Sequence, residues 1–579
     1  MRTIWSLWQK AVAANRTTPA YRVEEDDGWR EVSWKEAADA VEELSNGLLA
    51  LGLGKGDAFG ILAHTRLEWS LFDFALAQIG AVAAPIYPSS TPEEACYILE
   101  HSNAVGCLVE SDADLQRIAA MRPEHVYTVE TLDELRALGR AHAAEDPGAL
   151  ERARAAIGDD DLFTFIYTSG TTGPPKACMI LNRNYYEMVR RIDTVEDFFL
   201  ATDVMLLYLP MAHNFGRLMH LLGADVGYTI AFCSDPRRVG DVLPVVRPTI
   251  LPTVPRVLEK VHTAISANFA AATGVKRRLI NRALRVGRRV SELRQQGRPI
   301  PRGLAAQHRI ADKLVYSKVK DRLGGRLRAA ISGGAPLAKE IAEFFHTLDI
   351  LVLEGYGQTE GTTASNVNQP KAFKFGTVGP AIPGIEVATA PDGEILVKGP
   401  TVFAGYYNDD EATRAVLPGD GWLHTGDVGE IDEDGFLSIT DRKKDIIVTA
   451  GGKNVSPQNI ENALKGIPWV SQALVVGDRR PHLVALITLD EDEVGKWAAG
   501  RGLEGAAQDL SQGDEIKRLV EQAVDRVNER LARFEQVRRF EILPADFSAE
   551  ANEVTPTLKL KRRIVEEHFA EEIEQLYAG

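Results

Sequence analysis

The stretch Phe165–Ala177, FIYTSGTTGPPKA, runs from an apolar, strand-like segment into a loop with two glycines, five hydroxyl side chains counting Tyr167, and one lysine. Glycine lets the backbone approach a ligand closely, and hydroxyl and free N–H groups donate hydrogen bonds to phosphate oxygens. Lys176 adds a positive charge. The stretch therefore predicts a strand followed by a loop that surrounds a polyphosphate. With S-G-T-T-G alone, an ordinary Gly/Pro turn would be the better interpretation.

This loop is not the phosphate loop of the common P-loop NTPases. Their pattern GxxxxGK[ST] fails in this stretch, and it fails again around Gly452-Lys453, where Asn454 follows the lysine. The sequence therefore excludes that class of nucleotide-binding protein.

The composition is that of a folded protein with several domains. The chain has 579 residues, of which 45% are hydrophobic and 26% charged, and domains average about 150 residues. Its net charge of −16 argues against a nucleic-acid partner. Four cysteines, too far apart for a C-x-x-C pair, favour a reducing cytoplasm. Neither a signal peptide nor a membrane-spanning helix is expected.

The N-terminal part alternates helical and strand-like patterns. Ser33 and Glu36 predict a capped helix that ends near Gly52, and a second capped helix is expected from Thr91 to Glu100. Strand-like segments at 59–62 and 105–109 flank an apolar helix at 71–80. This alternation predicts an α/β fold built on largely parallel sheets.

Two later regions have other patterns. Short strands separated by Gly, Asp and Pro turns predict a β-rich subdomain over 387–440. After residue 441 the pattern restarts with a strand at 446–449, a helix capped by Ser456, and further strands and helices. We therefore expect an N-terminal domain over 1–440 and a small α+β C-terminal domain over 441–579.

The segment 276–328 is strongly basic. It holds 17 Lys and Arg against three acidic residues, a net charge of +14 in an otherwise acidic chain. A solvated helix face is the plain interpretation. The functional alternative is attraction to phosphates or to an anionic membrane surface.

The phosphate loop also carries a family resemblance. YTSGTTGPPK, at 167–176, resembles the signature of the adenylate-forming superfamily, which includes acyl-CoA synthetases, luciferases and the adenylation domains of peptide synthetases. Further motifs of that superfamily follow in family order over nearly the entire chain. They are LPMAHNFGR (209–217), SGGAPL (332–337), EGYGQTE (354–360), GEILVKGP (393–400), WLHTGD (422–427), DRKKDIIVTAGGKNVSP (441–457) and TPTLKLKRR (555–563).

Within the superfamily the chain resembles the long-chain fatty acyl-CoA synthetases. The similarity rests on TVPRVLEK at 253–260, on the basic insertion, and on the stretch 311–337. The chain departs from the family pattern at Ala177, where glycine is usual, and at Leu181-Asn182, where a Thr-His pair is usual. These departures bear on the identity of the acid and leave adenylation intact.

The resemblance assigns a nucleotide site. The β- and γ-phosphates would be held by the loop residues Thr168, Ser169, Gly170, Thr171, Thr172, Gly173 and Lys176. Glu360 would bind Mg²⁺, which prefers carboxylate and phosphate oxygens. The backbone of Gly333, Gly334, Ala335 and Pro336 would lie against adenine, and Tyr356 would cover the adenine ring. Asp427 would accept the ribose hydroxyls, supported by Arg442. The remaining residues expected at this site are Glu354, Gly355, Gly357 and Thr359.

Taken singly, these residues also have structural interpretations. Glu360 could be an acidic residue at a helix start, Tyr356 a core tyrosine and Asp427 a turn aspartate.

The resemblance also implies two conformations. Lys559 would reach the carboxylate and the α-phosphate during adenylation, which makes it a catalytic residue together with Thr168 and Glu360. Lys444 would be the hinge about which a mobile C-terminal domain rotates. That rotation would bring Gly451, Gly452 and Lys453 beside CoA. Read without the family, Lys559 and Lys444 are lysines in solvated charged stretches.

The acyl group is expected beside four residues, which are His213, Phe215, Val254 and Gly333. Alone, His213 would be interpreted as a core histidine. The resulting hypothesis is a ligase that uses ATP, Mg²⁺ and CoA to activate a long or bulky hydrophobic acid through acyl-AMP. Alternatives are a polycyclic or aryl acid, an acyl carrier protein as acceptor, or a binder without catalysis. Reversible contact with the inner face of the membrane is a further hypothesis.

Overall fold

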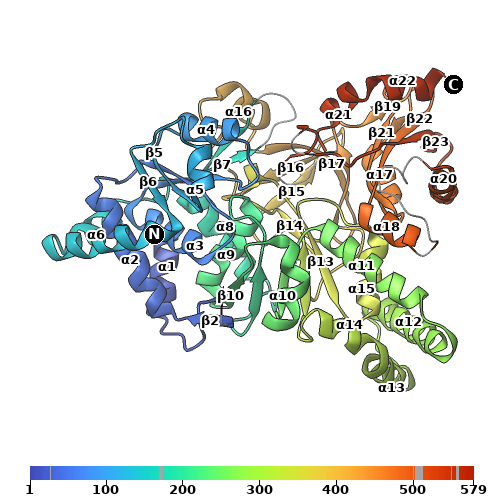
Figure 1. The fold of residues 1–579 in the computed structure, drawn as a ribbon, viewed down its shortest axis with the longest axis horizontal. Coiled ribbons are helices and arrows are strands. Elements are labelled where there is room, and N and C mark those ends of the chain that lie inside the picture. Colours follow the sequence, from blue (N-terminus) through green and yellow to red (C-terminus); the bar gives the residue numbers. More distant parts are fainter. Residues whose placement is uncertain are drawn as a thin grey trace.

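A computed structural model describes residues 1–26, 28–168, 174–499, 501, 513–548, 551–555 and 560–578 (Figure 1). Five residues of the phosphate loop, Ser169 to Gly173, and the predicted catalytic Lys559 lie outside the described residues.

A six-stranded sheet carries the start of the phosphate loop. Its order is β6-β5-β3-β4-β7-β8, parallel throughout except for the β7–β8 hairpin. The strands are β3 (Ala58–Leu62), β4 (Val82–Ile86), β5 (Ala104–Val109), β6 (His125–Thr128), β7 (Leu162–Thr168) and β8 (Lys176–Leu181). The predicted strand before the loop is therefore confirmed, and it lies next to the edge strand β8.

An eight-stranded sheet carries most of the other motifs, in the order β14-β13-β12-β11-β9-β10-β1-β2. Six central strands are parallel, and the edge strands β14 and β2 are antiparallel to their neighbours. The strands are β1 (Tyr21–Glu25), β2 (Gly28–Val32), β9 (Val204–Leu207), β10 (Thr229–Phe232), β11 (Ile250–Thr253), β12 (Ala329–Ser332), β13 (Leu351–Tyr356) and β14 (Asn366–Val367). The two sheets confirm the predicted parallel α/β fold.

Local signals explain several helices. Ser33 Oγ accepts a 3.1 Å hydrogen bond from Glu36 N at the start of α2 (Trp34–Ala50). Thr91 and Glu94 form a reciprocal capping box on α4 (Pro92–His101). The other helices around the two sheets are α1 (Ile4–Ala13), α3 (Leu67–Ile79), α5 (Asp112–Arg117), α6 (Leu132–Glu145), α7 (Ala149–Ala155), α8 (Asn182–Asp193), α9 (Asn214–Val226), α10 (Val239–Val246) and α15 (Lys339–Thr347).

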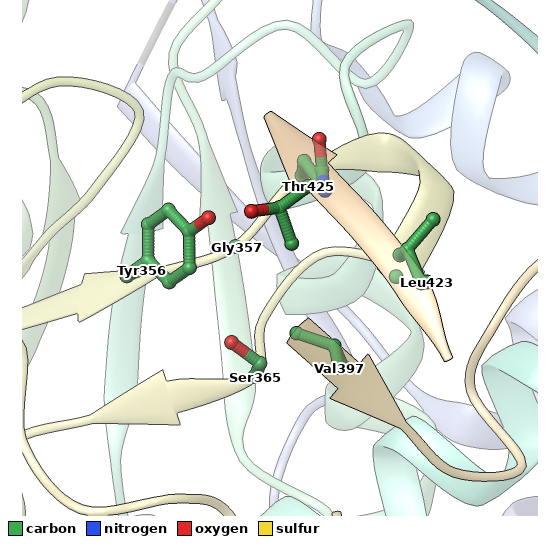
Figure 2. Close-up of a pocket in the computed structure, with 8 residues that line it drawn as sticks. Tyr356, Gly357, Ser365, Val397, Leu423 and Thr425 are labelled. Carbon is green, nitrogen blue, oxygen red and sulfur yellow. The ribbon is translucent and has the colours of Figure 1, made fainter. Parts of the chain in front are cut away.

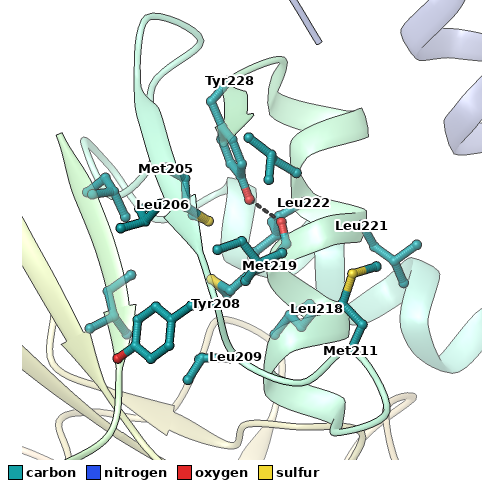
Figure 3. Packing of buried hydrophobic residues seen from close by; sticks show 14 of the residues in the cluster. Met205, Leu206, Tyr208, Leu209, Met211, Leu218, Met219, Leu221, Leu222 and Tyr228 are labelled. Carbon is teal, nitrogen blue, oxygen red and sulfur yellow. Dashed lines mark hydrogen bonds between the residues drawn. The ribbon is translucent and has the colours of Figure 1, made fainter. Parts of the chain in front are cut away.

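The core beneath the site is formed where β9 packs on α9. Figure 3 shows β9, which carries Met205 and Leu206, beside α9, which carries Leu218 and Leu222, and all four side chains are buried. Tyr228, two residues after α9, donates a hydrogen bond to the backbone carbonyl of Met219 in that helix. This packing fixes the segment between the strand and the helix, which contains His213.

A buried ion pair joins α9 to the six-stranded sheet and its helix α3. The fully buried Arg217 donates hydrogen bonds to Asp73 of α3 (Nε to Oδ2, 3.1 Å) and to Thr164 of β7 (Nη1 to Oγ1, 2.7 Å). Its guanidinium carbon lies 4.6 Å from the ring centroid of Phe163. The pairing satisfies charges that would be costly to bury alone, so α9 and β7 keep one relative position.

The predicted β-rich region is an antiparallel four-stranded sheet, β15-β16-β17-β18. The strands are β15 (Glu386–Thr389), β16 (Glu394–Lys398), β17 (Leu423–Ile431) and β18 (Leu437–Arg442), with the short helix α16 (Asp410–Val416) before β17. β18 runs two residues past the expected boundary at 440.

The C-terminal part has its own hydrophobic core. Its strands are β19 (Ile447–Val448), β20 (Asn454–Val455), β21 (Val470–Val476), β22 (Leu483–Leu489) and β23 (Val537–Ile542). Its helices are α17 (Pro457–Lys465), α18 (Glu491–Ala499), α20 (Asp514–Asn528), α21 (Arg562–His568) and α22 (Ala570–Ala578).

One local prediction in this part was wrong, and one predicted strand is shorter than expected. Ser456 precedes α17, but it does not cap the helix, because its hydroxyl donates instead to Thr440 O at 2.7 Å. The expected strand at 446–449 is only Ile447–Val448.

The basic segment folds into helices at one edge of the molecule (Figure 1). They are α12 (Gly274–Gln295), α13 (Arg302–Ala311), the π-helical turn η3 (Asp312–Tyr316) and α14 (Ser317–Arg322), and α11 (Pro255–Ala270) precedes them. In the described part of the chain, none of the helices is long and apolar enough to span a bilayer.

Candidate active site

The sequence motifs meet at the carboxyl edge of the eight-stranded sheet. β9, β11, β12 and β13 are parallel neighbours. The segments that follow them hold His213, Val254, Gly333 to Pro336, and Gly357 to Glu360. In open α/β sheets, ligands bind at the carboxyl ends of the strands, so this edge is the candidate active site.

The turn after β12 presents bare backbone. Gly334 has a φ of +83° and, like Ala335, is exposed. A Cβ atom built on Gly334 would meet no heavy atom within 4 Å, so the space beside this backbone is open. Gly333 is anchored by a 3.2 Å hydrogen bond from its N–H to Thr253 O, and Pro336 leads into the helix α15.

Tyr356, Asp427 and Arg442 form one polar cluster. The Tyr356 hydroxyl donates a 2.7 Å hydrogen bond to Asp427 Oδ2, and Arg442 Nε lies 3.3 Å from Asp427 Oδ1. Asp427 and Arg442 are paired residues of β17 and β18. Burial and the neighbouring Asp427 carboxylate raise the pKa of Tyr356 well above its usual value. The cluster offers a carboxylate beside an aromatic ring, the arrangement predicted for ribose and adenine.

Glu354 is a carboxyl group in a poorly solvated position. Burial raises its pKa to about 7, and a hydrogen bond from Leu337 N (3.0 Å to Oε1) opposes that shift. Leu337 follows Pro336 directly. Glu354 therefore ties the turn after β12 to the end of β13.

Of the two glycines beside Tyr356, only Gly357 is required by sterics. A Cβ on Gly357 would lie 2.2 Å from Thr363 O, whereas a Cβ on Gly355 would make an ordinary contact of 3.4 Å with Asn366 O. Thr359 is buried, and its hydroxyl accepts a 3.3 Å hydrogen bond from Asn214 Nδ2. A small cavity opens beside this backbone, between Tyr356, Val397 and Thr425 (Figure 2).

Glu360 and Lys176 are joined through Tyr406, which the sequence motifs did not reveal. The Tyr406 hydroxyl donates a 2.6 Å hydrogen bond to Glu360 Oε1. Lys176 Nζ lies 5.3 Å from the centroid of the same ring and 3.6 Å from Asp409 Oδ2. Burial first and the Glu360 charge second raise the pKa of Tyr406, so the hydroxyl is a donor at neutral pH.

Tyr406 reaches this place because residues 404–407 pair with the edge of β8. Met179 N donates to Gly405 O and Tyr407 N to Ala177 O, both at 2.9 Å. Gly405 has a φ of +124°. The only sequence signal was the run AGYYNDD at 404–410, which alone indicates a turn.

The flanks of the phosphate loop converge on this group. Thr168 and Lys176 are cross-strand partners, and Thr168 Oγ1 donates to Lys176 O at 3.4 Å. The two ends of the loop that the structure describes therefore lie side by side, and Lys176 is the one that reaches Tyr406.

The four predicted acyl contacts also lie together. His213 caps α9, with Nδ1 accepting a 3.2 Å hydrogen bond from Phe215 N. A Cβ atom built on Gly333 would lie 3.4 Å from the Phe215 ring. The N–H of Gly333 also donates a hydrogen bond to the carbonyl of Thr253, the residue before Val254. Phe215 and Val254 are partly buried and contact the core. The predicted residues thus lie beside the turn after β12.

Lys444 lies where β18 gives way to the C-terminal part. Burial and the nearby Arg442 lower its pKa. The neighbouring Lys443 binds Asp392 at 2.6 Å and Glu394 at 3.0 Å. The hairpin with Gly451, Gly452 and Lys453 is exposed, and it lies between β19 and β20.

The two departures from the family pattern have structural roles. Ala177 is fully buried in β8. Asn182 accepts a 3.1 Å hydrogen bond from Ile4 N and donates a 3.2 Å bond to Asp161 O. Asn182 therefore anchors the N-terminal helix and is buried away from solvent.

Family models match most of the chain. The AMP-binding enzyme model matches residues 8–407, and the AMP-binding enzyme C-terminal domain model matches residues 444–579. The chain is 38% identical over 564 residues to the long-chain-fatty-acid–CoA ligase FadD15 of Mycobacterium bovis, an alignment that covers 95% of this chain and 93% of that protein.

Solved structures share the fold at lower identity. The adenylation domain of a carboxylate reductase from Mycobacterium chelonae has a TM-score of 0.77 and 23% identity, and the alignment covers 100% of this chain and 91% of that one. O-succinylbenzoate CoA synthetase from Bacillus subtilis, in complex with ATP and magnesium, has a TM-score of 0.67 and 20% identity, with 96% and 98% covered.

Proposed function

The chain belongs to the AMP-binding enzyme family, and on that basis we propose that it is an AMP-forming ligase that joins a long-chain hydrophobic carboxylic acid to CoA. Relatives such as FadD15 support the reaction and the class of acid. One observation carries the proposal. The pair formed by Tyr356 and Asp427 lies at the same sheet edge as the group formed by Lys176, Tyr406 and Glu360. The reaction proceeds through acyl-AMP and pyrophosphate.

The nucleoside end of ATP fits the turn after β12 together with the cluster of Tyr356, Asp427 and Arg442. The open backbone of Gly334 and Ala335 receives adenine, and Tyr356 covers it. Asp427 offers carboxylate oxygens to the ribose hydroxyls, a strong acceptor for two donors. Arg442 lies beside that carboxylate and orients it.

The phosphate end fits the group around Lys176. A carboxylate that attacks the α-phosphorus brings one anion to another, so cations must offset the repulsion. Lys176 supplies one such charge. Glu360, held by Tyr406, offers a hard oxygen of the kind that Mg²⁺ takes, and Mg²⁺ bound there would neutralise phosphate charge. The similar fold of the Bacillus subtilis synthetase, which was solved in complex with ATP and magnesium, supports this assignment.

The acid approaches past His213, Phe215 and Val254, whose apolar surfaces suit a hydrocarbon chain. Gly333 leaves room where the acyl and adenylate portions meet.

The second step delivers CoA to the same carbonyl. We assign Lys444 as the hinge of a rotation that withdraws Lys559 and brings the Gly451–Lys453 hairpin to the thiol path. A few backbone dihedrals at a hinge can absorb such a motion.

The test is acid-dependent exchange of labelled pyrophosphate into ATP over a panel of acids, followed by the mass of the product formed with CoA. Exchange with long-chain acids and an acyl-CoA product are expected. Exchange only with aryl or polycyclic acids would mean that the substrate is an acid of that class and not a long-chain acid. Acyl-AMP that forms but is not transferred to CoA would indicate a carrier protein as the acceptor. No exchange with any acid would leave a nucleotide binder without catalysis.

We also propose reversible contact with an anionic membrane surface. Six arginines share the outer face of α12, and we name them the cationic face: Arg277, Arg278, Arg282, Arg285, Arg288 and Arg289. Ile310 and Leu314, exposed by 60% and 42%, lie one turn apart on the neighbouring α13 and η3. Cations beside exposed apolar side chains suit a lipid headgroup region.

A further inference from the structure

One ion pair links the acid-binding side of the large N-terminal part to the C-terminal part. Arg256 Nη2 donates 3.0 Å hydrogen bonds to Asp490 Oδ2 and to Ser471 Oγ. Arg256 lies in the first turn of α11, two residues after Val254. Asp490 immediately precedes α18, and Figure 1 shows α18 beside α11.

On the C-terminal side of this contact, hydrogen bonds hold both partners of Arg256 in place. Asp546 accepts hydrogen bonds from Ser471 and from Thr488 (Oγ1 to Oδ1, 2.6 Å). Asp490 Oδ1 accepts a 3.2 Å bond from Glu493 N at the start of α18. The side chains of Arg256 and Asp490 are only 28% and 13% exposed. A partly buried, charge-assisted contact between preformed groups holds better than a surface pair.

The contact is a second point of attachment, away from the hinge. Near the hinge, Ser456 Oγ donates to Thr440 O and Gln458 N to Asp441 Oδ2. Attachment there alone leaves rotation free. Arg256 belongs to α11 and Asp490 to the C-terminal part, so a rotation of that part about Lys444 moves the two side chains apart, and they meet in one orientation.

The exposure of the Gly451–Lys453 hairpin bears on which orientation this is. Residues 450–454 are all exposed, and a Cβ on Gly452 would meet no heavy atom within 4 Å. A hairpin that faces solvent is not lining a thiol path. An exposed hairpin is what the orientation for acyl-AMP formation requires.

We propose that Arg256 is a positioning residue that holds the C-terminal part in the adenylation orientation through Asp490 and Ser471, and so sets the balance between the two half-reactions. This inference rests on the proposed ligase function. In this role Arg256 does not contact the reacting atoms. It raises the fraction of enzyme molecules whose C-terminal part is in the adenylation orientation.

The test measures each half-reaction in the full-length enzyme. Arg256→Ala and Asp490→Asn should each slow acid-dependent pyrophosphate exchange about fivefold, the equivalent of a contact of about 1 kcal/mol. Thioester formation from supplied acyl-AMP and CoA should stay unchanged or rise. Asparagine at 490 keeps the helix cap. The control is Arg480→Ala, which removes an ion pair to Glu574 within the C-terminal part.

A double-mutant cycle separates this role from general destabilisation. If the pair acts as one unit, the double variant should lose no more exchange activity than either single variant. Equal losses in both half-reactions, additive losses, or unchanged exchange would overturn the proposal. A wild-type enzyme that exchanges with no acid would instead refute the ligase function itself.

Discussion

The Tyr356 hydroxyl donates a 2.7 Å hydrogen bond to the Asp427 carboxylate, although the two residues belong to different sheets. Tyr356 ends a strand of the eight-stranded sheet, and Asp427 lies in the antiparallel sheet of the β-rich region. The bond thereby joins the proposed adenine and ribose contacts into one surface.

Asp427→Ala should weaken nucleotide binding in both half-reactions, because the ribose stays bound throughout. Loss of charge-assisted hydrogen bonds costs roughly 1.5–3 kcal/mol, so the Kd for ATP should rise about tenfold or more. Calorimetric titration with ATP measures this. Glu430→Ala, an exposed change on the same strand, is the control, and unchanged ATP affinity in Asp427→Ala would remove the residue from the site.

Lys559→Ala should abolish pyrophosphate exchange and largely spare thioester formation from supplied acyl-AMP, because this lysine is assigned to the first conformation only. The comparison is with Lys561→Ala, two residues away. A parallel fall of both half-reactions would contradict the assignment.

Tyr406→Phe should weaken the response to magnesium, because the 2.6 Å bond that orients Glu360 is lost. A hydrogen bond of this kind contributes about 0.5–1.5 kcal/mol, so the Mg²⁺ concentration for half-maximal exchange should rise about two- to tenfold. Tyr407→Phe is a matched control, since that hydroxyl accepts from Asn103. An identical magnesium profile in the variant and the wild type would argue against this role.

Glu354→Gln should change how stability depends on pH. The pKa of Glu354 is raised to about 7 in the fold from an ordinary 4.5, so the folded state binds its proton more tightly than the unfolded chain. That contribution is complete below pH 4.5 and is lost as the pH rises through 7. Glutamine stays neutral at every pH. As the pH rises from 4.5 to above 7, the free energy of unfolding of the variant should therefore increase relative to that of the wild type, by up to about 3 kcal/mol. Thermal unfolding at pH 5, 6 and 8 tests the trend, and a constant difference between the proteins would contradict it.

The cationic face should bind anionic vesicles reversibly and lose them at high salt, because the Debye length falls to about 8 Å at physiological ionic strength. Sedimentation with anionic and neutral vesicles measures this binding. Vesicle binding should fall when four arginines of the cationic face are replaced by glutamine, namely Arg278, Arg282, Arg285 and Arg289. It should not fall when four control arginines are replaced in the same way, namely Arg526, Arg530, Arg533 and Arg538. Equal binding to both kinds of vesicle, or none at low salt, would make the face an ordinary solvated surface.

The sequence predicted much of the fold because local signals agree with the tertiary structure. The capping pair Thr91–Glu94 starts a helix as expected, and the apolar run before Thr168 is a parallel strand. Prediction failed where a partner distant in sequence competes. Ser456 has the composition of a cap, but a carbonyl of β18 takes its hydroxyl. β23 pairs in parallel with β22 across 47 intervening residues, a distance that no local pattern encodes.

The sequence by itself determined the chemistry that the chain can offer, since glycines, hydroxyls, carboxylates and a lysine occur in an order typical of one family. Only the tertiary structure decided which of them meet. Tyr406 lies between Lys176 and Glu360 because residues 404–407 extend the edge of β8, and Arg256 finds Asp490 because two separately folded parts dock. Hydrogen bonds and ion pairs depend on distances of a few ångströms, and such distances between remote segments arise only when the sheets and helices pack.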